Sequence, residues 1–106
     1  MSIVIKEAKT GTVLAQGQRG KDLIEYEGNL YFVPANVNQQ VLRVTERTYT
    51  CPYKGTCNWV DYAAPDGSLV RDVAWFYPQV KPGHEVIQGR FGFYAGTRGT
   101  TRQESA

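Results

Sequence analysis

The chain has 106 residues, of which 42% are hydrophobic and 21% charged, and its formal net charge is +2 at neutral pH. These values are typical of one globular domain that buries its own core without metal or disulfide support, and they exclude long disordered regions. So small a charge does not favour a nucleic-acid partner. The chain also lacks both the roughly 18 to 20 residue apolar run of a membrane span and the apolar stretch of a signal peptide, so the sequence predicts a cytoplasmic protein with no membrane partner.

Alternating apolar and polar residues in the first third of the chain predict two hairpins. Ser2–Glu7 and Thr12–Gln16 read as short strands on either side of a glycine-containing turn. A polar, glycine-rich loop follows, and Asp22–Glu27 and Leu30–Val33 then form a second pair around Gly28-Asn29. The connection within each pair is short enough for its two strands to be neighbours in one antiparallel sheet.

The rest of the chain predicts further strands separated by proline- and glycine-containing turns. They cover Gln40–Glu46 with a continuation over Thr48–Cys51, then Asn58–Ala63, Ser68–Tyr77 and Arg90–Ala95. Ser68–Tyr77 carries the strongest period of two in the sequence.

Helix contributes little to the prediction, because no segment of eleven or more residues has a helical period and only His84–Gln88 suggests a single turn. The sequence therefore predicts an all-β fold of about eight short strands in two packed sheets, a sandwich or open barrel. We expect one domain over residues 1–95. Residues 96–106, rich in Gly, Thr and Ser, are predicted to be a flexible C-terminal tail.

Two motifs dominate the second half, where ten of the thirteen aromatic residues lie between Tyr49 and Tyr94. They are TCPYKG followed by a tryptophan, and DVAWFYP, and shorter matches follow them. The residues concerned are Thr50–Gly55, Trp59, Asp72–Pro78, Ile87–Gly89 and Phe93-Tyr94. Over roughly Lys21 to Tyr94 the chain resembles a bacterial family called "domain of unknown function 427".

The resemblance implies an all-β domain of two packed sheets, similar to the tent-like fold of methionine sulfoxide reductase B, Mss4 and the thalidomide-binding domain of cereblon. It implies no activity, since the family is known chiefly as uncharacterised and its occasional nucleotidyltransferase label connects to no residue. Several tent-like relatives hold zinc between two C-x-x-C pairs. This chain has only Cys51, Cys57 and one distant histidine, too few ligands for a tetrahedral site, so we predict no metal and no cofactor.

The two cysteines flank a Pro-Tyr-Lys-Gly turn and allow three interpretations. A disulfide fits the loop size but not a cytoplasmic setting. A reactive thiol is possible because Lys54 would lower the pKa of a nearby sulfur. Alternatively, Cys51 is a small buried residue at the end of a strand, which is the common fate of a free cysteine.

Lys54 and Asp72 are predicted to form a pair. The period of Ser68–Tyr77 places Asp72 on an otherwise apolar face, where a carboxylate needs an ionic or hydrogen-bonded partner. Both the resemblance and the chemistry suggest Lys54, held on its turn by Pro52 and Gly55. Such a pair is either an acid–base or anion-binding group beside an aromatic wall, or a salt bridge that fixes the turn.

The aromatic side chains also allow two interpretations. Trp59, Trp75 and Tyr77 are suited to lining a small-molecule pocket, as in cereblon's aromatic cage, but equally to filling the core of a small β-domain.

The favoured hypothesis is a small-molecule binding module with an aromatic pocket near Lys54 and Asp72. Its candidate ligand-binding residues are Cys51, Tyr53, Lys54, Trp59, Asp72, Trp75 and Tyr77. One alternative is an enzyme that uses Cys51, Lys54 or Asp72, although the sequence assigns none of them a catalytic role. Another is a structural or protein-interaction domain.

Overall fold

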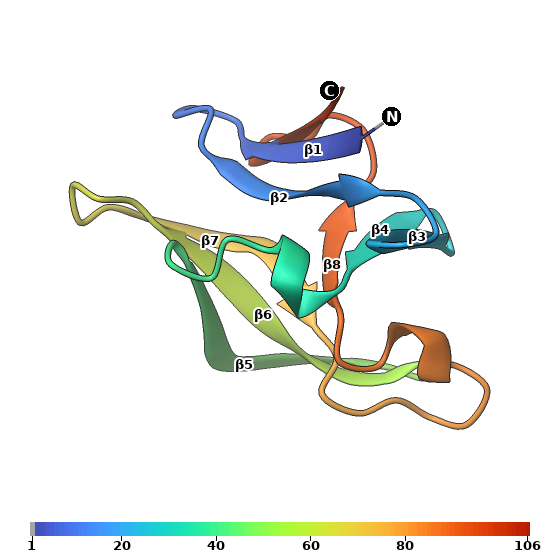
Figure 1. The fold of residues 1–106 in the computed structure, drawn as a ribbon. Coiled ribbons are helices and arrows are strands. Elements are labelled where there is room, and N and C mark those ends of the chain that lie inside the picture. The colour runs from blue at the N-terminus through green and yellow to red at the C-terminus, as the bar shows by residue number, and fades with distance from the viewer. Residues whose placement is uncertain (1) are drawn as a thin grey trace.

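A computed structural model describes residues 2–106, which form nine strands and two short 3-10 turns (Figure 1). The strands are β1 (Ser2–Glu7), β2 (Val13–Gln18), β3 (Leu23–Tyr26), β4 (Asn29–Phe32), β5 (Leu42–Cys51), β6 (Gly55–Ala63), β7 (Leu69–Phe76), β8 (Phe91–Tyr94) and β9 (Thr101–Ser105). The 3-10 turns are η1 (Pro34–Asn36) and η2 (Glu85–Ile87).

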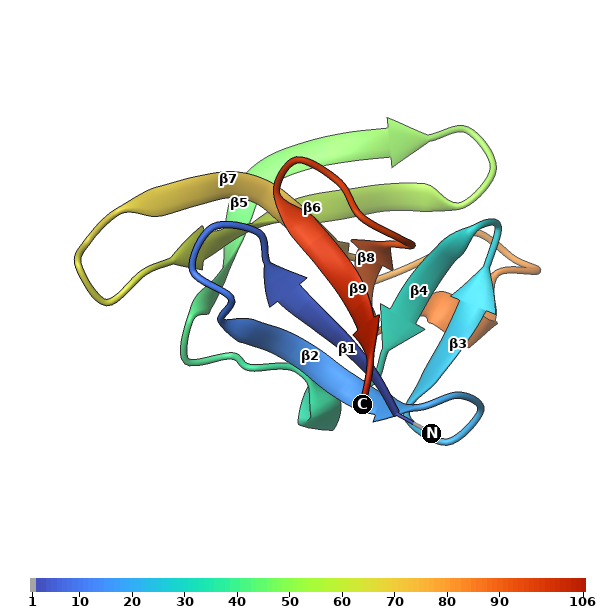
Figure 2. The same ribbon diagram turned by 90° about the horizontal axis from the view of Figure 1, so that it is seen from above.

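The strands form two antiparallel sheets. The smaller has the order β2-β1-β9 and the larger the order β3-β4-β8-β7-β6-β5. Figures 1 and 2 show the small sheet lying across one face of the large one. Within residues 2–106 neither sheet closes into a barrel. The predicted all-β class with two packed sheets is confirmed.

The main hydrophobic core lies between the two sheets. The small sheet contributes Ile3, Ile5 and Leu14, and the large sheet contributes alternate residues of its central strands, among them Val60 and Phe93. All five are 6% exposed or less. Because side chains of a strand alternate between faces, the neighbours of these large-sheet residues point to the opposite face, away from the small sheet. That second face carries the aromatic side chains described below.

Both predicted hairpins form, with the second turn one residue earlier than the predicted Gly28-Asn29. β1 pairs with β2, and β3 pairs with β4 around the two-residue turn Glu27-Gly28. Both turn residues have positive φ, 50° and 82°, the backbone that a tight two-residue hairpin requires. The single helical turn expected over His84–Gln88 corresponds to η2.

The expectation of a flexible tail over residues 96–106 needs correction. Thr101–Ser105 form β9, which pairs with β1 in register from Ile3 opposite Ser105 to Glu7 opposite Thr101. The backbone N–H of Ala106 donates to the carbonyl of Ser2 at 3.0 Å, so the two ends of the described chain lie together (Figure 2). The tail looked frayed because its residues are polar, but β9 is an edge strand whose ladder needs few apolar side chains.

The two helical segments of the described chain are single 3-10 turns, and neither has the length or hydropathy of a membrane-spanning helix.

Candidate functional site

An aromatic row crosses four strands on the face of the large sheet that points away from the main core. Trp59 on β6 lies opposite Trp75 on β7, Trp75 lies opposite Gly92 on β8, and Gly92 lies opposite Tyr31 on β4. The Trp59 and Trp75 rings are 6.3 Å apart between centroids and nearly perpendicular, at 80°. Such edge-to-face pairs are favourable aromatic contacts, so the row has a defined shape.

Gly92 makes this row possible, because it leaves a gap in the middle of the sheet. A Cβ on Gly92 would lie 2.2 Å from Nε1 of Trp75, so the indole occupies the space that any other residue would fill. Across the gap, Trp75 Nε1 donates a hydrogen bond to the Tyr31 hydroxyl at 3.2 Å. The polar end of the indole is thereby satisfied inside a buried cluster.

Residues before and after this row complete a pocket. Cys57 precedes Trp59 by two positions and lies opposite Tyr49 of β5, and Tyr94 on β8 lies opposite Asn29 of β4. The resulting cavity has a volume of about 240 Å³. Its lining comprises six aromatic side chains and three others, namely Tyr31, Tyr49, Trp59, Trp75, Tyr77, Tyr94, Asn29, Lys54 and Cys57.

Lys54 is delivered to the pocket by the turn between β5 and β6. Its carbonyl accepts a hydrogen bond from the Lys81 N–H at 2.8 Å, and its own N–H donates to the Cys51 sulfur at 3.4 Å. Gly55 has a φ of 120°, which disfavours a side chain, and a Cβ there would touch the Val80 backbone at 3.4 Å. The K-G dipeptide of the motif therefore lets the segment around Val80 fold against the turn.

The Lys54 ammonium has a carboxylate partner on another hairpin. Nζ lies 3.0 Å from Oε1 of Glu27, in the β3–β4 turn. Burial is the largest single influence and lowers the pKa of Lys54, but the hydrogen bond to the Glu27 carboxylate and the nearby charges together outweigh it, so the net pKa is raised. Lys54 is therefore a cation at neutral pH.

Three other titratable groups of the lining are held in their neutral forms by burial. Burial raises the pKa of the Tyr31 and Tyr77 hydroxyls and of the Cys57 thiol. The pocket thus combines apolar ring surfaces, hydroxyl groups and one ammonium.

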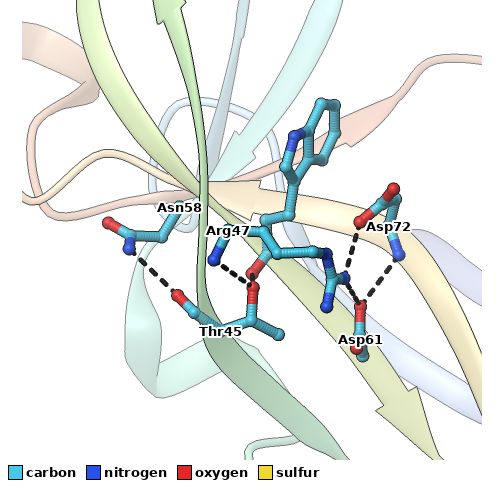
Figure 3. Close-up of polar contacts among 6 residues, drawn as sticks. Thr45, Arg47, Asn58, Asp61 and Asp72 are labelled. Atoms are coloured by element: carbon cyan, nitrogen blue, oxygen red, sulfur yellow. Dashed lines mark hydrogen bonds and ion pairs between the residues drawn. The ribbon is translucent and has the colours of Figure 1, made fainter.

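The predicted pairing of Lys54 with Asp72 is wrong. Asp72 binds Arg47 of β5, with 2.8 Å between its Oδ1 and Nη2 of Arg47, and the same Nη2 also binds the buried carboxylate of Asp61 (Figure 3). The Asp61 carboxylate also accepts the Asp72 N–H at 3.0 Å. Asp72 does have an ionic partner, as the sequence argument expected, but that partner is Arg47, and the Asp72 side chain is 46% exposed.

Two irregular positions in the strands bring this cluster together. Val44 and Thr48 pair with Val60 and Asn58, so three residues of β5 oppose one of β6. The backbone groups freed there bond to side chains: Thr45 Oγ1 donates to the Trp59 carbonyl at 2.8 Å. Such bulges bend a strand and redirect its side chains, and here one turns Arg47 towards β6 and β7.

β7 carries a matching bulge. Val60 of β6 pairs with Ala74 of β7, but Tyr62 pairs with Val70, so three residues of β7 lie opposite the single residue Asp61. The middle one of these three is Asp72, which has a φ of 60°. A left-handed residue breaks the simple alternation that predicted where Asp72 points. A single sequence gives no signal for such a bulge beyond the acidic residue on an apolar strand.

The cysteines form no disulfide, and they differ in their surroundings. Cys57 is buried and lines the pocket, whereas Cys51 is partly exposed at the end of β5 and lies outside the lining. Burial raises the pKa of Cys51, but hydrogen bonds from the N–H groups of Lys54 and Tyr53, with the nearby ammonium of Lys54, make the net pKa lower than usual. Tyr53 is 75% exposed and also lies outside the pocket.

Of the seven candidate residues, the structure brings four together: Lys54, Trp59, Trp75 and Tyr77. Five lining residues were not among the candidates, namely Asn29, Tyr31, Tyr49, Cys57 and Tyr94. The FGFY stretch offered one signal, because a glycine inside an aromatic strand marks a place where another group approaches the backbone. Across residues 2–106, no group of three or more His, Cys, Asp or Glu side chains is placed to hold a metal ion.

Comparison with known proteins supports the resemblance seen in the motifs. No curated protein matches the chain. The likeness to Mss4 stays a prediction, since no comparison tests it. The sequence profile of one family, described as "Domain of unknown function (DUF427)", matches residues 3–104, which include both sheets and every pocket residue. The chain therefore belongs to the DUF427 family.

Proposed function

We propose that this domain binds a small molecule that carries a ring. The ligand binds in the aromatic pocket, on the face of the large sheet that points away from the main core. The observation that supports this most is the pocket's lining, six aromatic side chains around about 240 Å³. Ligand sites are typically concave and mostly apolar, with a few fixed polar groups that orient the ligand. Lys54, Asn29 and the tyrosine hydroxyls supply such groups here.

The position of the pocket also favours binding over a purely structural role. The main core between the sheets already buries fifteen residues, and the pocket lies on the other side of the large sheet. Tyr49 of the lining is 52% exposed, so its ring is held at the surface instead of packing into the interior. An aromatic ring held at the edge of a cavity in this way offers stacking surface to a ligand, above the buried rings of Tyr31, Trp75 and Tyr77.

The geometry does not favour the catalytic alternative. The three residues considered for catalysis do not form one site: Lys54 lines the pocket, Cys51 contacts the Lys54 backbone but lies outside the lining, and Asp72 is bound to Arg47. A nucleophile is activated by a neighbouring base, a lowered pKa or a metal ion. Cys57 does line the pocket, but its raised pKa keeps it a thiol at neutral pH.

Intrinsic fluorescence offers a direct test, because the only two tryptophans of the sequence, Trp59 and Trp75, both line the pocket. A metabolite library screened by thermal shift should yield a ring compound that raises the melting temperature and also changes tryptophan emission, with one dissociation constant for both signals.

Two tyrosines of the β5–β6 hairpin provide a matched pair of variants. Tyr49 lines the pocket and Tyr53 does not, and both are more than half exposed, so neither truncation should cost much stability. Tyr49→Ala should weaken the ligand about tenfold by removing one stacking ring, whereas Tyr53→Ala should leave affinity unchanged. Ligands that lose equal affinity in both variants, or a screen with no ligand, would contradict the proposal.

A further inference from the structure

We propose that the ligand is a small ring-bearing acid whose carboxylate binds Lys54 by taking the place of the Glu27 carboxylate. This inference rests on the proposed binding function and names the chemical class of its ligand. Three observations support it: the charge of the lining, the nature of the Lys54–Glu27 contact and the size of the cavity.

The charge of the lining favours an anion. The lining in the described chain contains one lysine, Lys54, and no aspartate, glutamate, arginine or histidine. The pKa of Lys54 is raised, and burial raises the pKa of the Tyr31 and Tyr77 hydroxyls and of the Cys57 thiol, which keeps these three groups neutral. Aromatic walls without such a lysine attract cations. An ammonium within the wall repels a cationic ligand and attracts a carboxylate.

In the ion pair between Lys54 and Glu27, the Glu27 carboxylate is the partner that a ligand can displace. The Lys54 side chain is 15% exposed and its backbone is held by Cys51 and Lys81, so the ammonium keeps its position. The Glu27 side chain is 51% exposed, sits in a two-residue turn and does not line the cavity. Exposed ion pairs add little stability, so an incoming carboxylate can replace Glu27 at small cost.

The donor count at Lys54 shows how the exchange can proceed. An ammonium has three N–H donors, and Nζ of Lys54 makes one hydrogen bond to a described side chain, at 3.0 Å to Oε1 of Glu27. A ligand carboxylate can therefore accept a second N–H before the Glu27 bond breaks. The β3–β4 turn can then release its side chain to solvent without moving the strands.

The cavity limits the size of this acid. About 240 Å³ lies below the roughly 300 to 1,000 Å³ that is typical of pockets for drug-sized ligands. A single ring with one carboxylate fits this volume. The aromatic row then contacts the ring while Lys54, at the turn, meets the acid group.

Three single-ring probes of nearly equal shape test the charge requirement: benzoate, benzamide and benzylamine, which are anionic, neutral and cationic at pH 7. Binding is read from tryptophan emission of the full chain. We expect benzoate to bind about fivefold more tightly than benzamide, because a charge-assisted bond is stronger than a neutral one. Benzylamine should bind most weakly.

Substitutions at Lys54 and Glu27 test separately the preference for an anion and the exchange of carboxylates. Lys54→Met keeps the length of the side chain and should abolish the preference for benzoate over benzamide while benzamide still binds, which also shows that the variant is folded. Glu27→Gln removes the competing charge and should tighten benzoate about two- to fivefold with benzamide unchanged. Lys21→Met, an exposed lysine in the loop after β2, removes the same charge outside the pocket and should change nothing.

Each other outcome has a definite meaning. If benzoate and benzamide bind equally and Tyr49→Ala weakens both, the pocket binds rings but the inference of an acid is wrong. If Glu27→Gln leaves benzoate binding unchanged or weaker, the exchange of carboxylates is wrong. If benzoate does not bind, the inference is overturned, while the metabolite screen still decides the proposed function independently.

Discussion

The indole of Trp75 hydrogen-bonds to the hydroxyl of Tyr31 over the backbone of Gly92, joining β7 to β4 across the intervening strand. Both rings are buried, at 6% and 0% exposure, and their centroids are 6.1 Å apart at 79°. This contact forms the floor of the pocket. It exists only because β8 presents no side chain at that position.

Gly92→Ala should therefore disrupt the pocket. Its Cβ would lie 2.2 Å from Nε1 and 2.4 Å from Cε2 of Trp75, so the indole must move and lose its bond to Tyr31. Overpacking of this kind costs about 1–3 kcal/mol, measurable by urea unfolding, and a shift in tryptophan emission should accompany it. Gly99→Ala is the control, because no atom lies within 4 Å of its added Cβ. Unchanged stability and emission in Gly92→Ala would contradict this account of the floor.

Asp61 and Asp72 share Arg47 but should differ in what they contribute to stability. Asp61 is 7% exposed and accepts both the arginine and the Asp72 N–H, whereas the Asp72 side chain is 46% exposed. Asp61→Asn should lower the free energy of unfolding by about 1.5–3 kcal/mol, since hydrogen bonds to a buried charge are lost. Asp72→Asn should cost less than about 1 kcal/mol, because asparagine tolerates positive φ and the ion pair is exposed. Equal losses in urea unfolding would show that the two carboxylates act as one unit.

Glu7 makes part of the domain's folding stability depend on pH in the acid range. Its buried carboxylate accepts the N–H groups of Thr10 at 2.8 Å and Lys9 at 3.1 Å, and the Thr10 hydroxyl at 2.9 Å. Burial raises the pKa of Glu7, but these hydrogen bonds outweigh burial and the net pKa falls below its ordinary value of 4.5. A lowered carboxylate pKa stabilises the fold above about pH 4.5, and this stability is lost as the pH falls through the folded-state pKa.

Glu7→Gln should accordingly be less stable than the unsubstituted chain at pH 7, by about 1–2 kcal/mol, with the gap narrowing towards pH 3. Thermal unfolding at several pH values measures this gap. Glu46→Gln, at an exposed carboxylate of β5, provides a control with the same change in charge and should follow the unsubstituted chain. A gap that stays constant with pH would mean that Glu7 contributes by shape alone.

The two thiols should react at different rates. Cys51 is partly exposed and its net pKa is lowered by N–H donors from Lys54 and Tyr53 despite burial, whereas burial raises the pKa of Cys57. Because the thiolate is the nucleophile, iodoacetamide at pH 7.5 should alkylate Cys51 first. Peptide mass spectrometry identifies the modified site, and Cys51→Ser should remove the fast phase while Cys57→Ser keeps it. Faster labelling at Cys57 would show that the pocket activates its thiol.

The sequence determined the features that depend on local chemistry. Alternation placed eight of the strands, and proline and glycine placed the turns between them, because these effects act within a few residues. The motif residues also indicated an aromatic site that includes Lys54, Trp59, Trp75 and Tyr77. β9 escaped prediction because an edge strand with polar side chains owes its pairing to β1, which lies almost the whole chain length away.

Only the tertiary structure decided which charges meet and where the pocket closes. Asp72 was expected beside Lys54 on the assumption of regular alternation, but bulges in β5 and β7 bring it to Arg47 instead. Lys54 instead forms an ion pair with Glu27, a residue of a hairpin distant in sequence. Likewise, the strand order β4-β8-β7-β6 places Tyr31 beside Trp75 although 44 positions separate them in sequence. A local pattern and its turn can specify how two strands of a hairpin pair, but the packing of the whole sheet decides which strands distant in sequence become neighbours.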